Sequence, residues 1–173
     1  MKRFRVVIGA LALLTMGTCV RSQDLKQKYV GKSGCTEGIR GRQYGARLDK
    51  TQNTYLEARV LPTVKVLLII QFQDASDRCG LIRDIVENHR IAADFEFACV
   101  DNHRPSEIVI GTRDSDDEKI TGPAIQAWLI DLKNQSFVLT RDRVTCSREN
   151  DAGSDDGSDL VDAAKKHATH QKL

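Results

Sequence analysis

The sequence predicts an all-β fold, a small β-sandwich or barrel with two disulfides. Short segments of alternating apolar and polar residues recur along the chain, and turn-forming residues separate them. Four cysteines follow an N-terminal segment that is typical of exported proteins. Roughly eight or nine short strands fit between residues 43 and 146, which suits a sandwich or a barrel.

The N-terminal segment has the order of a secretory signal peptide. Lys2, Arg3 and Arg5 precede the apolar run 6–16, and small and polar residues follow it. The run has eleven residues, whereas a helix needs about 20 to cross a bilayer. We therefore expect residues 1–22 to be a signal peptide, and no transmembrane segment after its cleavage.

A lipid anchor at Cys19 is not expected. A bacterial lipoprotein signal needs Leu three places before its cysteine and a small residue just before it, and these places hold Met16 and Thr18. The expected location is extracytoplasmic, either secreted or in a bacterial periplasm. Removing residues 1–22 takes away four basic residues and no acidic one, so the formal charge changes from +2 to −2. Without a clustered basic stripe, we expect no nucleic-acid partner.

The four remaining cysteines predict disulfides, because an exported chain meets an oxidising compartment. They allow three pairings. The sequence favours a nested arrangement in which Cys79 pairs with Cys99 and Cys35 with Cys146. A zinc site would need close cysteine pairs, and these cysteines are widely spaced.

Three zones follow the signal peptide. Residues 23–42 are polar and rich in glycine, which predicts an irregular arm pinned by Cys35. Residues 43–146 hold nearly all the apolar residues and form a single β-rich domain. Residues 147–173 are acidic and polar, so we expect a disordered tail, with a short stretch near residues 160–167 that could be helical.

The first half of the domain predicts a hairpin and a central strand. Residues 44–48 and 56–60 alternate around a turn at 50–53, as in a hairpin. In the run 64–72, one set of apolar residues points to one face while Leu67 and Ile69 point to the other, which indicates a strand buried on both faces.

The segment around residues 78–90 is ambiguous. Leu81, Ile82, Ile85, Val86 and His89 have helical spacing. The β-branched pair at 85–86 favours a strand, and one short helix remains the alternative.

Alternation continues to the end of the domain. Phe95, Phe97 and Cys99 are expected to share one face of a strand. A second hairpin turns at 133–136, between a strand containing Trp128 and one containing Phe137. Trp128 is expected in the core because apolar residues share its face, whereas Tyr55 is expected to be the more exposed aromatic. The remaining face-sharing residues are Ile108, Ile110, Ile130, Leu132 and Leu139.

No catalytic motif is complete. The chain has neither a phosphate-binding loop nor the G-x-S-x-G motif of serine hydrolases. His89 and His103 have carboxylates nearby in sequence, Asp101 among them, and either could act as a general base. A structural role at the ends of strands is favoured for both, so the chain is expected not to be an enzyme.

One acidic loop has the residue types of a calcium site. Asp114, Asp116 and Glu118 alternate, and carboxylate oxygens are ligands for Ca²⁺. The sixth position of the loop holds Lys119 where an EF-hand needs glycine. A solvated loop is therefore favoured, and no metal or cofactor is expected.

These observations predict a binding or interaction module for a protein or a glycan. The alternatives are a small secreted hydrolase that uses His89 or His103, and an extracytoplasmic enzyme inhibitor. Fold class does not choose among them.

Overall fold

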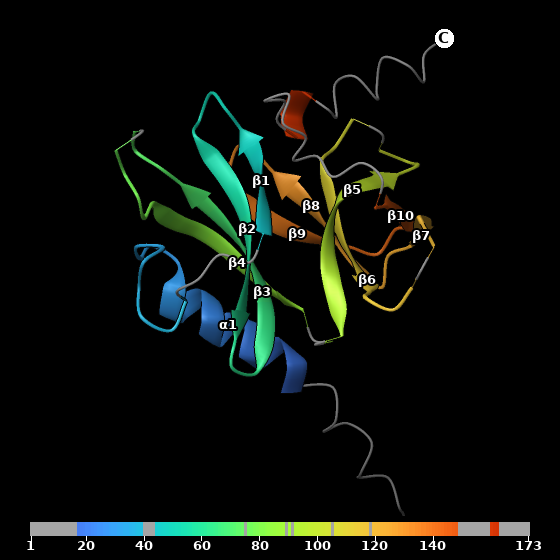
Figure 1. The fold of residues 1–173 in the computed structure, drawn as a ribbon, viewed down its shortest axis with the longest axis horizontal. Coiled ribbons are helices and arrows are strands. Elements are labelled where there is room, and N and C mark those ends of the chain that lie inside the picture. The colour runs from blue at the N-terminus through green and yellow to red at the C-terminus, as the bar shows by residue number, and fades with distance from the viewer. Residues whose placement is uncertain are drawn as a thin grey trace, which may run out of the picture.

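The computed structural model describes residues 17–39, 44–74, 76–88, 90, 92–104, 106–117, 119–148 and 160–162. Figure 1 shows two antiparallel sheets with a helix at one side. The predicted β-rich sandwich with two disulfides is confirmed. The elements are α1 (Gly17–Tyr29), β1 (Tyr44–Asp49), β2 (Thr54–Leu61), β3 (Val64–Gln71), β4 (Leu81–Asn88), β5 (Ala93–Asp101), β6 (Val109–Asp114), β7 (Thr121–Pro123), β8 (Gln126–Asp131), β9 (Ser136–Thr140) and β10 (Val144–Ser147).

The first sheet has the strand order β1-β2-β3-β4, with every neighbouring pair antiparallel. The predicted first hairpin is β1–β2. Its turn is held by Asp49, whose Oδ1 accepts a hydrogen bond of 2.8 Å from the Thr51 backbone, and Asn53 adopts a positive φ of 50°. The ambiguous segment forms β4, so the strand alternative is the one that the structure shows.

The second sheet has the order β7-β10-β5-β6-β8-β9. The predicted second hairpin is β8–β9, and its turn places Gln135 at a φ of 50°. The chain passes from the first sheet to the second between β4 and β5. Residues from both sheets form one buried apolar core, so the core lies between the sheets.

Strand β3 is buried on both faces, as the sequence predicts. Leu67 and Ile69 join the core between the sheets, together with Phe95 and Trp128, whose rings lie 6.0 Å apart. The opposite face of β3 packs against α1 and the loop that follows it. These residues form a second buried apolar cluster, which includes Tyr29. Trp128 is only 4% exposed, which confirms its predicted place in the core.

The expectation for Cys99 is wrong. Phe95 and Phe97 pack toward the inter-sheet core, but Cys99 lies in a cluster on the other face of the second sheet. The register between β5 and β6 shifts between Glu96 and Cys99, where β5 has one residue more than its partner. Since a one-residue slip moves side chains to the opposite face, this β-bulge reverses the alternation that the sequence shows.

The nested disulfide pairing is also wrong. The structure joins Cys35 to Cys79 and Cys99 to Cys146. Cys99 and Cys146 are direct partners in the β5–β10 ladder, so strand register brings them together. The other bridge follows from a hydrogen bond of 3.0 Å that the Gly34 backbone donates to Gly80, which places the arm beside β4.

Two segments differ from the expected zones. Residues 23–29 of the expected irregular arm belong to α1. Of the expected tail, Ser147 is the last residue of β10, and Leu160 to Asp162 form a helical turn in which Leu160 is buried in the inter-sheet core. Residues 1–16 of the predicted signal peptide lie outside the described residues. In the described part of the chain, no helix has both the length and the apolar character needed to span a membrane.

Candidate functional site

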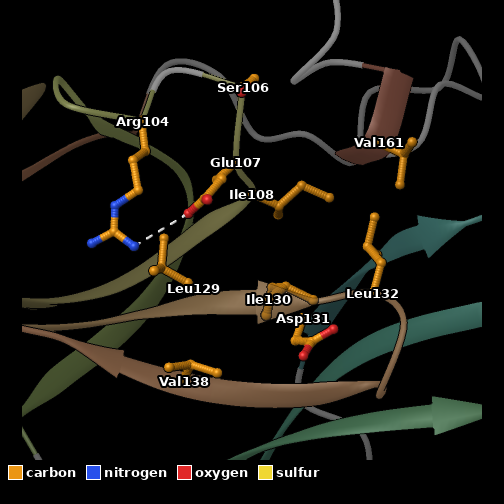
Figure 2. Close-up of a pocket in the computed structure, with 10 residues that line it drawn as sticks. All are labelled: Arg104, Ser106, Glu107, Ile108, Leu129, Ile130, Asp131, Leu132, Val138 and Val161. Atoms are coloured by element: carbon orange, nitrogen blue, oxygen red, sulfur yellow. Dashed lines mark ion pairs between the residues drawn. The ribbon is translucent and has the colours of Figure 1, made fainter.

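A hollow of about 460 Å³ opens beside β8 and β9 (Figure 2). It lies within the size range of small-ligand and side-chain pockets. Its walls come from residues 104 and 106–108, from the two strands and Leu132 in the turn between them, and from the C-terminal turn. The residues that line it are Arg104, Ser106, Glu107, Ile108, Leu129, Ile130, Asp131, Leu132, Val138 and Val161.

The apolar part of the hollow follows from strand register. Val109, Leu129 and Val138 are successive partners across β6, β8 and β9, so they form one row on the outer face of the second sheet. Exposure increases along this row from 1% at Val109 to 8% at Leu129 and 48% at Val138. The row is therefore covered at its centre and open at β9.

The polar part is a fixed ion-pair network around Arg104. Its guanidinium lies 3.4 Å from Asp101 and 3.5 Å from Glu107, and it also hydrogen-bonds to Asp142. The hydrogen bond with Asp142 raises the pKa of Arg104, and the same contact lowers the pKa of Asp142. Arg104 thus stays charged and is shared among three carboxylates.

Asp131 supplies a further charge on the wall of the hollow. Its carboxylate accepts hydrogen bonds from the Asn134 side chain at 2.6 Å and from the Asn134 backbone at 3.0 Å. These bonds lower the pKa of Asp131, so it remains ionised at neutral pH.

The structure gives Asp101 a positioning role in the loop. Its side chain is fully buried, and its Oδ1 accepts a hydrogen bond of 2.9 Å from the backbone of His103. The Arg104 backbone donates to the Asp101 carbonyl oxygen at 3.0 Å. Asp101 therefore shapes the turn that carries Arg104 and Glu107 to the hollow.

The residues predicted as catalytic candidates do not form a nucleophile–base pair in the described structure. His103 and Asp101 are brought together, but their hydrogen bond uses the His103 backbone and leaves the imidazole out. Ser106 lines the hollow, and no hydrogen bond joins its hydroxyl to a histidine among the described residues. His89 lies outside the described residues.

The acidic loop after β6 is organised by two arginines. Arg113 is 1% exposed, and its guanidinium bonds to the Asp117 carboxylate at 2.7 Å and to the carbonyl oxygens of Lys119 and Ile120. The hydrogen bond from Arg113 lowers the pKa of Asp117. The cation bound by these loop oxygens is thus the guanidinium of Arg113.

Arg148, the residue after β10, completes this arrangement. It bonds to the carbonyl oxygens of Asp114 and Asp117 at 2.8 and 2.6 Å, and to the Glu96 carboxylate at 3.1 Å. Asp114 and Asp116 are exposed and do not line the hollow, and Glu118 lies outside the described residues. Within the described ranges, no group of three or more metal-ligating side chains is close enough to hold an ion.

Sequence reasoning missed the residues that shape the hollow. Arg104, Leu129 and Val138 belong to no motif, and only the pairing of β8 with β6 and β9 brings them together. One sequence feature could have pointed to the hollow. Val138 and Leu139 are consecutive apolar residues in a short strand, so both faces of the strand carry an apolar side chain.

The fold and the hollow define a disulfide-bonded, two-sheet β protein with a side pocket. No protein-family model matches the chain, and the comparisons with curated proteins and with solved structures found no match. Function must therefore be inferred from the geometry alone.

Proposed function

We propose that this chain is an extracytoplasmic module that binds a segment of another protein at the hollow beside β9. The observation that carries the proposal is the apolar row that ends, uncovered, at Val138 on the wall of the hollow. Exposed apolar surface that continues into a pocket is typical of an interaction site. The two disulfides fit a protein of an oxidising compartment.

The lining favours a protein over a glycan. Sugar rings commonly stack on exposed aromatic side chains, and none of the ten lining residues is aromatic. Aliphatic side chains with a charged rim match the pattern of protein interfaces, in which an apolar centre is surrounded by polar groups. Trp128 and Phe137, which are next to lining residues in sequence, are both buried in the core.

The test is selection from a random nine-residue peptide library displayed on phage, with a glycan array examined in parallel. We expect peptides to be enriched and Val138→Trp, which fills the hollow from its rim, to abolish their binding. Val60→Trp is the matched control because Val60 is similarly exposed, at 53%, on β2 of the other sheet. Enrichment of glycans alone, no enrichment, or equal loss in both variants overturns the proposal.

A further inference from the structure

The start and the end of β9 differ in how their outer edge is covered. At the start, the Phe137 backbone donates a hydrogen bond of 2.8 Å to the buried carboxylate of Asp84 on β4. Beyond Phe137, no described strand pairs with this edge, since β9 is the last strand of its sheet. The stretch of this edge that has no strand partner is therefore Val138 to Thr140.

The direction of the backbone groups on this stretch follows from two neighbouring hydrogen bonds. The Ile130 backbone donates to Ile108 on the β6 side, and Phe137, the partner of Ile130, donates to Asp84. Ile130 and Phe137 are thus a non-hydrogen-bonded pair of the β8–β9 ladder. Because this pattern alternates, Leu139 also directs its N–H and C=O away from β8.

Side-chain burial also ends at this edge, on both faces of the sheet. Besides the row that ends at Val138, a second row runs through Ile110, Trp128 and Leu139, whose exposure rises from 0% to 4% and then 57%. An added strand would continue both rows. Its residues opposite Val138 and Leu139 would cover the two side chains that the sheet leaves exposed.

We propose that the partner binds as an added β-strand along the outer edge of β9, with aliphatic residues that continue the two rows and a basic residue at the mouth of the hollow. This inference rests on the proposed function and specifies how the partner is held. Strand addition uses backbone hydrogen bonds for affinity and alternate side chains for specificity.

Charge complementarity assigns the basic residue. Arg104 is surrounded by the carboxylates of Asp101, Glu107 and Asp142, and Asp131 adds a further negative charge on the wall. The groups that form and hold the mouth are therefore net acidic. The basic residues of the turns at the two ends of β9 are exposed and do not line the hollow; they are Lys133, Arg141 and Arg143. A lysine or arginine can lay its aliphatic stem on Leu129 and Val138 and place its charge beside Glu107.

The experiment is N-methyl scanning of the peptides that the library selects, made synthetically and measured by NMR titration of the full chain. We expect every second amide to be sensitive, with N-methylation there weakening binding about tenfold and having little effect at the amides between. A uniform response along the peptide, or selected peptides without alternating aliphatic residues, overturns the inference but leaves the proposed function standing. A library that yields no peptide removes both.

Two sets of protein variants test the proposal from the other side. The first compares the backbone N–H of Leu139 with its side chain, and the second tests the acidic charges at the mouth of the hollow. Leu139→Ala keeps the outward N–H, whereas Leu139→Pro removes it without breaking a bond to β8, so Leu139→Pro should bind about tenfold more weakly than Leu139→Ala. Replacing Glu107 by Gln together with Asp131 by Asn should weaken basic peptides about two- to fivefold. Equal binding by the two Leu139 variants, or tighter binding of basic peptides to the double variant, contradicts the proposal. Thermal unfolding of each variant shows whether it is folded. The N-methyl scan of the peptides uses the unmodified protein and therefore does not depend on the folding of these variants.

Discussion

Asp84 joins three separate parts of the fold through one carboxylate. It is 4% exposed and forms an ion pair with Lys26 of α1 at 2.8 Å. It also accepts hydrogen bonds of 2.8 Å from the backbones of Ile85 and Phe137, the latter on the opposite sheet. Because backbone N–H groups buried without a partner are costly, this side chain stabilises the contact between β4 and β9.

We predict that Asp84→Ala lowers the free energy of unfolding by about 3 kcal/mol, since it leaves two buried N–H groups without an acceptor. Lys26→Ala should lower it by at most about 1 kcal/mol, because the lysine side chain is 40% exposed and its ion pair is screened by solvent. Urea unfolding of the two variants measures the difference. Equal losses would show that the ion pair, and not the backbone contacts, is the important interaction.

Sequence reasoning could not find this role at the residue scale. Asp84 and Phe137 are 53 residues apart, and no local pattern links them. The same holds for Asp101, which the sequence suggests as a partner for a catalytic histidine and which the structure shows capping a turn. An aspartate that accepts backbone hydrogen bonds cannot be told apart, in sequence, from an aspartate that orients an imidazole.

At the scale of elements, two arginines hold the loop between β6 and β7. Carbonyl oxygens at 114 and 117 bind Arg148, and those at 119 and 120 bind Arg113. These oxygens are the kind of ligand that Ca²⁺ would use. In the structure, guanidinium groups are bonded to all four of these carbonyl oxygens.

We predict that millimolar Ca²⁺ does not change the Tm of the protein. Arg148→Ala should lower the free energy of unfolding by about 2 kcal/mol, because several charge-assisted hydrogen bonds are lost from a partly buried group. Arg143→Ala, at an exposed arginine in the preceding turn, is the control and should have little effect. A rise in Tm with Ca²⁺ but not with Mg²⁺ would instead show that the loop is a calcium site.

The strands themselves were largely predictable, but their exact faces were not. Alternation located both hairpins and the two-faced burial of β3, because apolar periodicity reports which side chains avoid water. It failed at β5, where the bulge between Glu96 and Cys99 inserts a residue that the apolar pattern does not reveal. The disulfide pairing failed for the same reason, since it depends on which strands lie side by side.

For the whole molecule, acid stability follows from the carboxylates of its turns. Hydrogen bonds and ion pairs at these turns lower the pKa of five aspartates, namely Asp74, Asp77, Asp117, Asp131 and Asp142. Their folded-state pKa values lie below the unfolded value of about 3.9, so the folded protein binds fewer protons. Their contribution to stability is complete above the unfolded pKa and is lost as the pH falls through the folded values.

We therefore predict that the midpoint of urea unfolding is flat from about pH 7 to 5 and falls steeply below about pH 4. Asp77→Asn should make this decrease less steep, because Asp77 accepts backbone bonds from Gln73, Cys79 and Gly80 in its charged form. Unfolding curves recorded at constant ionic strength supply the measurement. A midpoint that rises between pH 4 and 3 would contradict this account.

The C-terminal turn at residues 160–162 packs against the two-sheet fold. Leu160 is 4% exposed in the inter-sheet core, Val161 lines the hollow, and Asp162 forms an ion pair of 2.7 Å with Lys50. The sequence predicts a disordered tail from residue 147, because its composition is dominated by charge and small residues. One buried leucine is too local a signal to change that average.

We predict that Leu160→Ala costs about 2–3 kcal/mol of stability, as expected for a truncated core leucine, whereas Asp162→Ala costs at most about 1 kcal/mol because its ion pair is exposed. A chain that ends at residue 159 should be at least as destabilised as Leu160→Ala, and it should bind selected peptides differently because it lacks one wall of the hollow. If truncation leaves the urea midpoint unchanged, the turn contributes nothing to the fold and the domain ends at β10. If it lowers both stability and peptide affinity, the tail belongs to the core and to the binding site alike.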